Sequence, residues 1–204
     1  MISFHSNKDD NKSLTAATES VPFTAVTEAK GERDAATIDT PNAFIQTKIN
    51  QGPGEERTMM KTQGTSVDAL TDINPLSCKD AVAFENGKKT SCMQALRAIH
   101  RMLQSAMLFH KKFRKDLECI GFEHNPHDPC VANNKVAGNQ MTIAIHVDNI
   151  KASHKSDKEM TKFVKCLQDK CGEIGKLKAT RGKKHTHSGI KLDCSVRGKV
   201  KVDM

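Results

Sequence analysis

The stretch CVANNKVAGNQMTIAIHVDNIKAS, residues 130–153, decides the fold of this 204-residue chain. It offers Cys130-Val-Ala132, a turn at Ala137-Gly-Asn139, and an apolar run over residues 141–147. Short apolar and β-branched runs between turn signals are typical of neighbouring strands. Asp148-Asn149 supplies a tight turn before Ile150-Lys-Ala-Ser153. The stretch therefore predicts an antiparallel meander with Asp148 at the tip of a hairpin.

Residues 20–47 predict a helix, a strand and a second helix. Apolar residues spaced along residues 21–29 predict a helix that stops at Gly31, and Asp34-Ala-Ala-Thr-Ile-Asp39 predicts a short buried strand. Thr40 as an N-cap and Pro41 in the first turn then predict a helix over 42–47. Asp39 is thus expected at a strand end, where α/β proteins often place functional side chains.

Further helices and hairpins complete the expected fold. Asn86-Gly87 predicts a hairpin between residues 81–85 and 88–92, and apolar spacings of three and four predict a long helix from Ser91 to Gly121. Ser156-Asp-Lys-Glu159 is a capping box for another helix that stops at Gly172. A last hairpin is expected about Arg197-Gly198. This order of elements predicts an α+β fold with an antiparallel sheet.

Composition restricts the functional classes. The chain has no apolar run of the roughly 18 residues that a membrane span needs, and residues 1–13 are polar without periodicity, so we expect a disordered lead before a domain over 14–204. Seven cysteines without a CxxC pair favour a reducing, cytoplasmic setting, with the nucleus as the alternative. Residues 1–78 hold 7 basic and 11 acidic residues, whereas residues 79–204 hold 25 and 13. The second part could therefore face phosphate or simply be a solvated basic surface.

Two groups of residues have the chemistry of metal ligands. Asp39 and Asp148 both lie at turns beside apolar strands, and Mg²⁺ prefers such carboxylate oxygens, although an Asp at a turn is most often a turn residue. His124, His127 and Cys130 have the residue types of a zinc site but lack a fourth ligand, so a plain connecting loop is the alternative.

Several motifs resemble one family. Asp39-Thr-Pro-Asn-Ala-Phe44 resembles the D-x-x-x-A-F motif of copia-type retrotransposon reverse transcriptases, and Phe122 with Asp128-Pro-Cys-Val131 is similar to their G-F…D-P-C segment. His146-Val-Asp-Asn149 stands where the family has Y-V-D-D. The surroundings of Gln104 and Gly189 are similar to two further family elements. The matches occur in the family's order over about residues 20–200.

The resemblance implies a palm-like antiparallel sheet backed by helices, with partial fingers and no thumb. It implies RNA-directed DNA polymerase chemistry, in which Asp39 and Asp148 bind Mg²⁺, with Mn²⁺ as the alternative, and act with Asn149 in catalysis. It further implies a substrate-binding set of Phe44, Gln104, His146 and Val147. The implied partners are an RNA or DNA template with primer, a deoxynucleoside triphosphate and other polyprotein segments, without a membrane.

One departure from the family affects the expected activity. Asn149 replaces the second Asp of the hairpin, which removes one carboxylate from a site that should balance two dications. We therefore expect impaired polymerase activity. The alternatives are a non-catalytic basic domain that binds nucleic acid, or a remnant without function.

Overall fold

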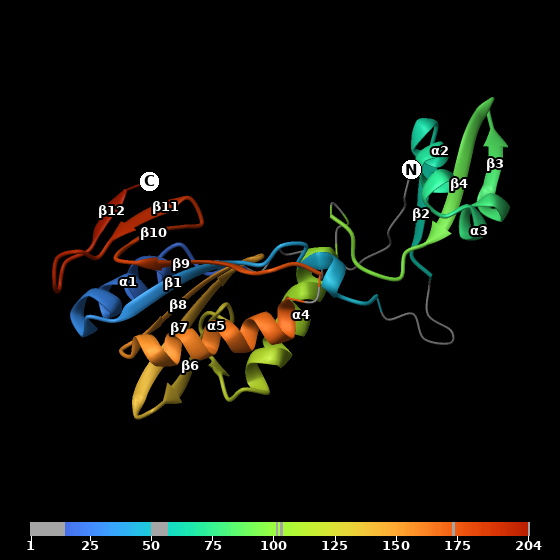
Figure 1. Cartoon of the computed structure of the whole chain (residues 1–204). Helices are drawn as coiled ribbons and strands as arrows, with labels where there is room; N and C mark the ends of the chain where they lie inside the picture. The colour runs from blue at the N-terminus through green and yellow to red at the C-terminus, as the bar shows by residue number, and fades with distance from the viewer. Residues whose placement is uncertain (1–14, 50–56, 101, 103, 173, 204) are drawn as a thin grey trace.

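The described residues form two lobes (Figure 1). The computed structural model describes residues 15–49, 57–100, 102, 104–172 and 174–203; the expected lead, residues 1–13, lies outside them. The large lobe is built on a six-stranded sheet of order β5-β6-β7-β8-β1-β9, and a three-stranded sheet, β10-β11-β12, lies beside it. The small lobe holds the third sheet, β2-β4-β3. Every pairing is antiparallel, which confirms the predicted α+β class.

The predicted meander forms the centre of the large sheet. Strand β7 pairs with β6 on one side and β8 on the other, and β1 lies between β8 and β9, so a strand from the start of the chain is enclosed by late ones. The six strands are β1 (Asp34–Asp39), β5 (Glu123–His124), β6 (Val131–Val136), β7 (Asn139–His146), β8 (Asn149–His154) and β9 (Lys178–Gly182).

Helices cover both faces of the large sheet. Helix α5 (Asp157–Cys171) lies on the face that carries Ile38, Ile145 and Ile150, each at most 1% exposed, and α4 (Ser105–Glu118) contributes to the same core. The N-cap predicted for α5 is confirmed, because the Ser156 hydroxyl accepts a hydrogen bond from the Glu159 backbone N–H. The opposite face, which carries Asn149, is covered by α1 (Ser20–Gly31) and the β10-β11-β12 sheet.

The small lobe has little core of its own. It contains β2 (Met59–Gln63), α2 (Thr65–Ile73), α3 (Pro75–Cys78), the 3-10 helix η3 (Lys79–Ala81), β3 (Val82–Glu85) and β4 (Lys88–Gln94). The predicted hairpin at Asn86-Gly87 is confirmed as the β3–β4 turn. Only Val67 and Cys78 are buried apolar side chains among these elements, while Leu76 and Phe84 are 93% and 74% exposed.

One predicted helix is confirmed only in its second part, and another is wrong. The helix predicted from Ser91 begins only at Ser105, because residues 88–94 pair with β2 and β3 instead, and Thr62 lies opposite Ser91. The helix predicted over 42–47 is a turn followed by one 3-10 turn, η2 (Phe44–Gln46). Asn42 has a φ of 55°, a left-handed conformation that interrupts a right-handed helix.

The basic C-terminal region forms β10 (Lys184–His187), β11 (Ile190–Asp193) and β12 (Lys201–Asp203). Strands β11 and β12 pair across the connection that contains Arg197-Gly198, as predicted. A second hairpin, between β10 and β11 at Ser188-Gly189, was not predicted. Within the described ranges, no helix has the length and apolar character needed to cross a bilayer.

Candidate functional site

The structure brings Asp39 and Asp148 to the same end of the large sheet. Asp39 is the last residue of β1 and lies opposite Asn149, the first residue of β8. The backbone N–H of Thr40 donates to the Asp148 carbonyl oxygen at 3.1 Å, which ties the end of β1 to the hairpin tip. Two positions that lie over a hundred residues apart in sequence thus meet through strand register alone.

The hairpin that carries Asp148 has a strained tip. His146 pairs with Asn149, so Val147 and Asp148 form a two-residue turn. Val147 has a φ of 57°, which is an outlier for a β-branched residue and costs about 1–3 kcal/mol. Strain of this kind clusters at functional sites, because the surrounding structure must maintain it.

Asp39 and Asp148 carry the type of oxygen donor that a hard cation prefers. The Asp39 and Asp148 side chains are partly exposed, and neither carboxylate has a hydrogen-bond or ion-pair partner in the part of the chain that the structure describes. No cluster of three or more His, Cys, Asp or Glu side chains is arranged for a metal among these residues. Two free carboxylates fit Mg²⁺, which usually takes one or two carboxylates and completes its shell with water and phosphate oxygens.

The side chain of Asn149 contacts a buried histidine. The Nδ1 atom of His187, on β10, lies 3.2 Å from Oδ1 of Asn149, and the His187 ring makes an edge contact with His146 at a centroid distance of 6.1 Å. Burial lowers the pKa of His187 to about 3, and the positive charge of Lys151 acts in the same direction. The imidazole is therefore neutral at physiological pH.

A buried ion pair lies below the hairpin. Lys151 is two residues beyond Asn149 on the same face of β8, and its ammonium group contacts Glu28 of α1. Both side chains are at most 3% exposed, and Thr24 accepts a further hydrogen bond at 3.4 Å. Helix α1 is thereby fixed to the strand that follows the hairpin. Sequence reasoning missed this pair and His187; the only available signal for the histidine was the alternation His185-Thr-His187 along one strand.

The other expected substrate-binding residues lie further along the chain. Phe44 is in η2, five residues after Asp39, where its ring packs edge-on against His100 at 4.9 Å and against Phe109 at 6.3 Å. Gln104 immediately precedes α4, and its carbonyl oxygen accepts from the Leu108 N–H. Val147 and His146 lie on the hairpin itself. The roles of these residues in binding substrate stay predictions.

The zinc alternative is not supported. Cys130 Sγ faces His110 Nε2 at 3.6 Å, while His124 Nδ1 contacts the carbonyl oxygen of Pro129 and His127 is exposed, so the three side chains do not share a centre. Burial raises the pKa of the Cys130 thiol to about 12, with a further contribution from the Asp128 charge, which makes it a poor ligand at neutral pH.

Asp128 connects the hairpin region to the start of α1. Its carboxylate accepts from the Ala17 backbone N–H at 3.0 Å and from the Ser20 hydroxyl at 2.5 Å. Beside it, the Ala16 N–H donates to the carbonyl oxygen of Ile145 in β7. A cavity of about 330 Å³ lies between this segment, His146 and the Ser188-Gly189 turn. The Asp128-Pro-Cys-Val131 motif therefore has a structural role beside the hairpin.

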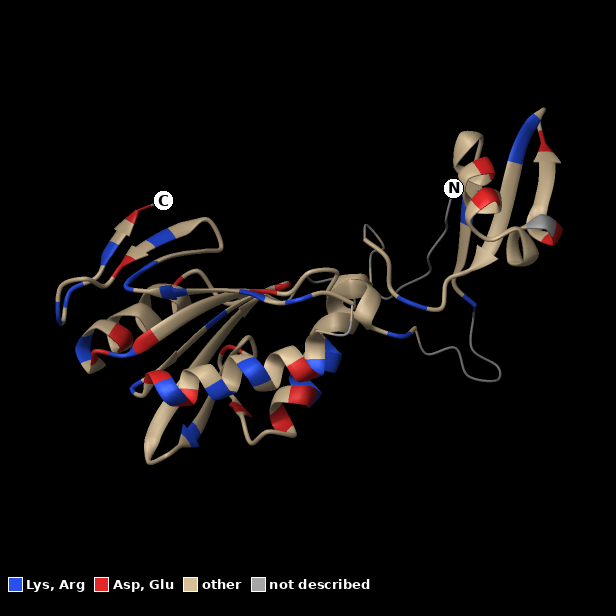
Figure 2. Ribbon diagram, viewed as in Figure 1, with Lys and Arg blue, Asp and Glu red and all other residues tan. Residues whose placement is uncertain are grey.

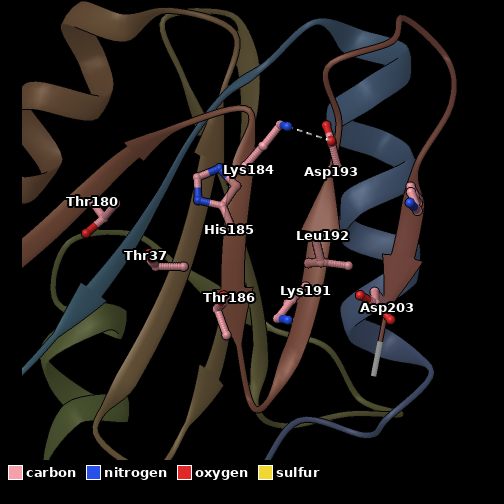
Figure 3. Close-up of a pocket in the computed structure, with 10 residues that line it drawn as sticks. Thr37, Thr180, Lys184, His185, Thr186, Lys191, Leu192, Asp193 and Asp203 are labelled. Carbon is pink, nitrogen blue, oxygen red and sulfur yellow. Dashed lines mark ion pairs between the residues drawn. The ribbon is translucent and has the colours of Figure 1, made fainter.

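The positive charge of residues 79–204 is dispersed. Figure 2 shows Lys and Arg on α4, α5 and the β10-β11-β12 sheet, interspersed with Asp and Glu. Several of these cations are paired, such as Lys112 with Asp116 and Arg114 with Glu118. Another cavity, of about 530 Å³ and lined by residues of β9 to β12, mixes both signs, because Lys184 lies 3.3 Å from Asp193 there (Figure 3).

Comparisons with known proteins show similarity at the level of fold. No protein-family model matches the chain, and no curated protein matches it in sequence. Among solved structures, the chain is similar to apo telomerase from Candida tropicalis truncated from its C-terminal domain, with a TM-score of 0.50 and 10% identity over 94% of this chain. Telomerase from Candida albicans in complex with a fragment of telomeric RNA matches with a TM-score of 0.49 and 7% identity over 97% of this chain.

The chain spans 41% of the Candida tropicalis protein and 35% of the Candida albicans protein. The fold is thus similar to that of the Candida tropicalis telomerase. Nothing in these matches is specific to copia-type elements.

Proposed function

We propose that this chain is the palm and part of the fingers of a copia-like reverse transcriptase, and that it binds a primer–template duplex with one divalent cation at Asp39 and Asp148. The observation that carries the proposal is the register of β1 and β8, which brings Asp39 and Asp148 to one end of the sheet. Neither carboxylate has an ion-pair partner among the described residues, although Lys178 of β9 lies opposite Asp39. The similarity of fold to telomerase supports the same assignment.

The residues of the site have separate roles in this proposal. Asp39 and Asp148 hold the cation, which when bound supplies positive charge to phosphate oxygens. Val147 keeps Asp148 at the tip of the hairpin, and Phe44 follows Asp39 at the position where the family excludes a ribose 2′ hydroxyl. Asn149 adds no charge, so the site balances less positive charge than two dications bring. Nucleotide addition by this chain is consequently weak or absent.

Binding of a fluorescent primer–template duplex tests the proposed cation site at Asp39 and Asp148. We expect Mg²⁺ or Mn²⁺ to tighten binding, and Asp39→Asn and Asp148→Asn to remove that metal-dependent gain, because each leaves one carboxylate for the cation. Asp169→Asn, at an exposed position on α5, is the matched control and should keep the gain. A metal-dependent gain that survives both Asp39→Asn and Asp148→Asn contradicts the proposed site.

Primer extension tests the proposed loss of nucleotide addition. We expect little or no extension by the unmodified chain and a measurable increase in Asn149→Asp, since the substitution restores a carboxylate at the hairpin. Robust synthesis by the unmodified chain would show that the proposed impairment is wrong.

A non-catalytic nucleic-acid-binding domain is the second candidate, and Asn149 is the observation that favours it. In that case the duplex binds through Lys and Arg alone, with an affinity that falls steeply as salt rises and does not respond to EDTA. The metal dependence of binding therefore separates the two candidates.

A further inference from the structure

The contact between His187 and Asn149 determines which oxygens the site can offer. His187 is fully buried, with 0% exposure, and its Nδ1 lies 3.2 Å from Asn149 Oδ1. Its other ring nitrogen, Nε2, is also buried and has no hydrogen-bond partner among the described residues. A neutral imidazole carries one proton, so one of these nitrogens donates and the other can only accept.

Burial selects between the two tautomers. With the proton on Nε2, the ring would bury an N–H without an acceptor, and the Asn149 amide would have to turn its NH2 group toward Nδ1. Orphaned buried N–H groups are rarer in proteins than under-satisfied acceptors. With the proton on Nδ1, the N–H donates to the amide oxygen, and only an acceptor lone pair is left unpaired.

We propose that His187 is a positioning residue whose Nδ1–H holds the Asn149 amide oxygen, so that Asp39 and Asp148 alone supply the oxygen ligands of a one-cation site. The cation itself rests on the proposed function, whereas the contact does not. An amide has a single oxygen, and the imidazole fixes its direction toward β10. A carboxylate at this position would keep a second oxygen for a metal, which gives the Asn149→Asp change its expected effect.

His185 provides an internal control two residues away on the same strand. Its Nε2 lies 2.6 Å from the carbonyl oxygen of Gly182, which can only accept, and its Nδ1 is buried without a partner in the described structure. Figure 3 shows the His185 ring on β10. His185 must therefore carry its proton on Nε2, and the two histidines of one strand should have opposite tautomers.

Long-range proton–nitrogen NMR of the ¹⁵N-labelled full chain reads both tautomers without any substitution. We expect Nδ1–H for His187 and Nε2–H for His185. An Nε2–H form of His187 overturns the inference, because the amide oxygen would then be free.

Mn²⁺ titration monitored by electron paramagnetic resonance tests whether the site binds one cation and whether His187 limits its affinity. We expect one bound ion in the unmodified chain and a second in Asn149→Asp. His187→Phe, which removes the N–H donor, should tighten the first ion several-fold, whereas His187→Gln, which keeps a donor, should not. Two ions in the unmodified chain, or equal affinities in the two His187 variants, overturn the inference. No bound Mn²⁺ together with an Nδ1–H His187 supports the contact and contradicts the proposed function.

Discussion

The two lobes contain similar secondary structure but are held together differently. The large lobe buries a continuous apolar cluster from α1 to β11, including Phe109, Phe113 and Ile143, and encloses a charged pair within it. The small lobe, residues 59–94, contributes nothing to that cluster and exposes Phe84 and Leu76. Its ion pairs, Lys61 with Glu85 and Lys89 with Asp68, lie at the surface.

The two lobes therefore differ in how strongly packing specifies the positions of their residues. The candidate site lies at the end of strands that are enclosed by packing on both faces, so its geometry is specified by many neighbours. The small lobe depends on strand pairing and a few contacts, which places it among the less stable parts of the chain. Substitutions in the large lobe should therefore change stability strongly, and comparable substitutions in the small lobe should change it little.

The largest expected effect comes from breaking the buried ion pair. Glu28→Gln should lower the free energy of unfolding by about 3–5 kcal/mol, because it leaves the Lys151 ammonium group buried without a counter-charge. Asp68→Asn in the small lobe should change it by less than about 1 kcal/mol, since that pair is exposed. Guanidinium unfolding of both variants makes the comparison, and equal losses would contradict it.

Thiol labelling of the buried cysteines should differ between the lobes by a large factor. With a pKa of about 12, the Cys130 thiol has roughly a thousandth of the thiolate of an ordinary cysteine near pH 8. We expect mass spectrometry after alkylation to show exposed Cys92 and Cys119 labelled first, then buried Cys78 of the small lobe, and Cys130 last. Labelling of Cys130 before Cys78 would reverse the proposed order of stability.

Acid should weaken the large lobe selectively. Because burial lowers the His187 pKa to about 3, the unfolded chain binds a proton between about pH 6.5 and 3 that the folded chain does not, and stability falls as pH falls through that window. Between pH 7 and 5 this histidine alone should cost about 2 kcal/mol. Between the same two pH values, the free energy of unfolding of His187→Gln, measured with guanidinium, should fall by that much less than the free energy of unfolding of the unmodified chain. The small lobe contains no histidine, and an identical pH dependence of the variant would contradict the assignment.

Removing a helix cap should have the smallest effect. Ser156→Ala removes the side-chain acceptor at the start of α5 and should cost about 1 kcal/mol. Helix α2 of the small lobe begins at Thr65 after Gly64, without a side-chain cap, so Ser66→Ala should be nearly neutral. Thermal unfolding of the two variants measures the difference, and an equal shift would show that the cap contributes nothing.

Sequence reasoning succeeded where the signal was local. The meander over residues 130–153, the capping box at Ser156 and the hairpin at Asn86-Gly87 each depend on residues within a few positions of one another. The position of Asp39 at a strand end and of Asp148 at a hairpin tip was predicted from local signals, and the β1–β8 register brings both to the same end of the sheet. Their shared role as metal ligands stays a prediction.

The failures have a common physical origin in distant partners. Residues 91–94 carry a helix-like pattern, yet β2, thirty residues earlier in a weakly patterned stretch, pairs with them. His187 becomes a partner of Asn149 only because β10 folds back over β8. Local periodicity predicts neither the β2–β4 pairing nor the contact between His187 and Asn149, since both depend on tertiary structure.

The position of β1 between β8 and β9 sets the timing of folding on the ribosome. The chain completes Asp39 about 110 residues before Asn149, its neighbour in the sheet. At roughly 5–20 residues per second, β1 waits between about 6 and 22 s for its first strand partner. During that interval the strand that carries Asp39 has two unpaired edges, which makes the nascent chain a substrate for chaperones and a source of aggregation until the last third of the sequence emerges.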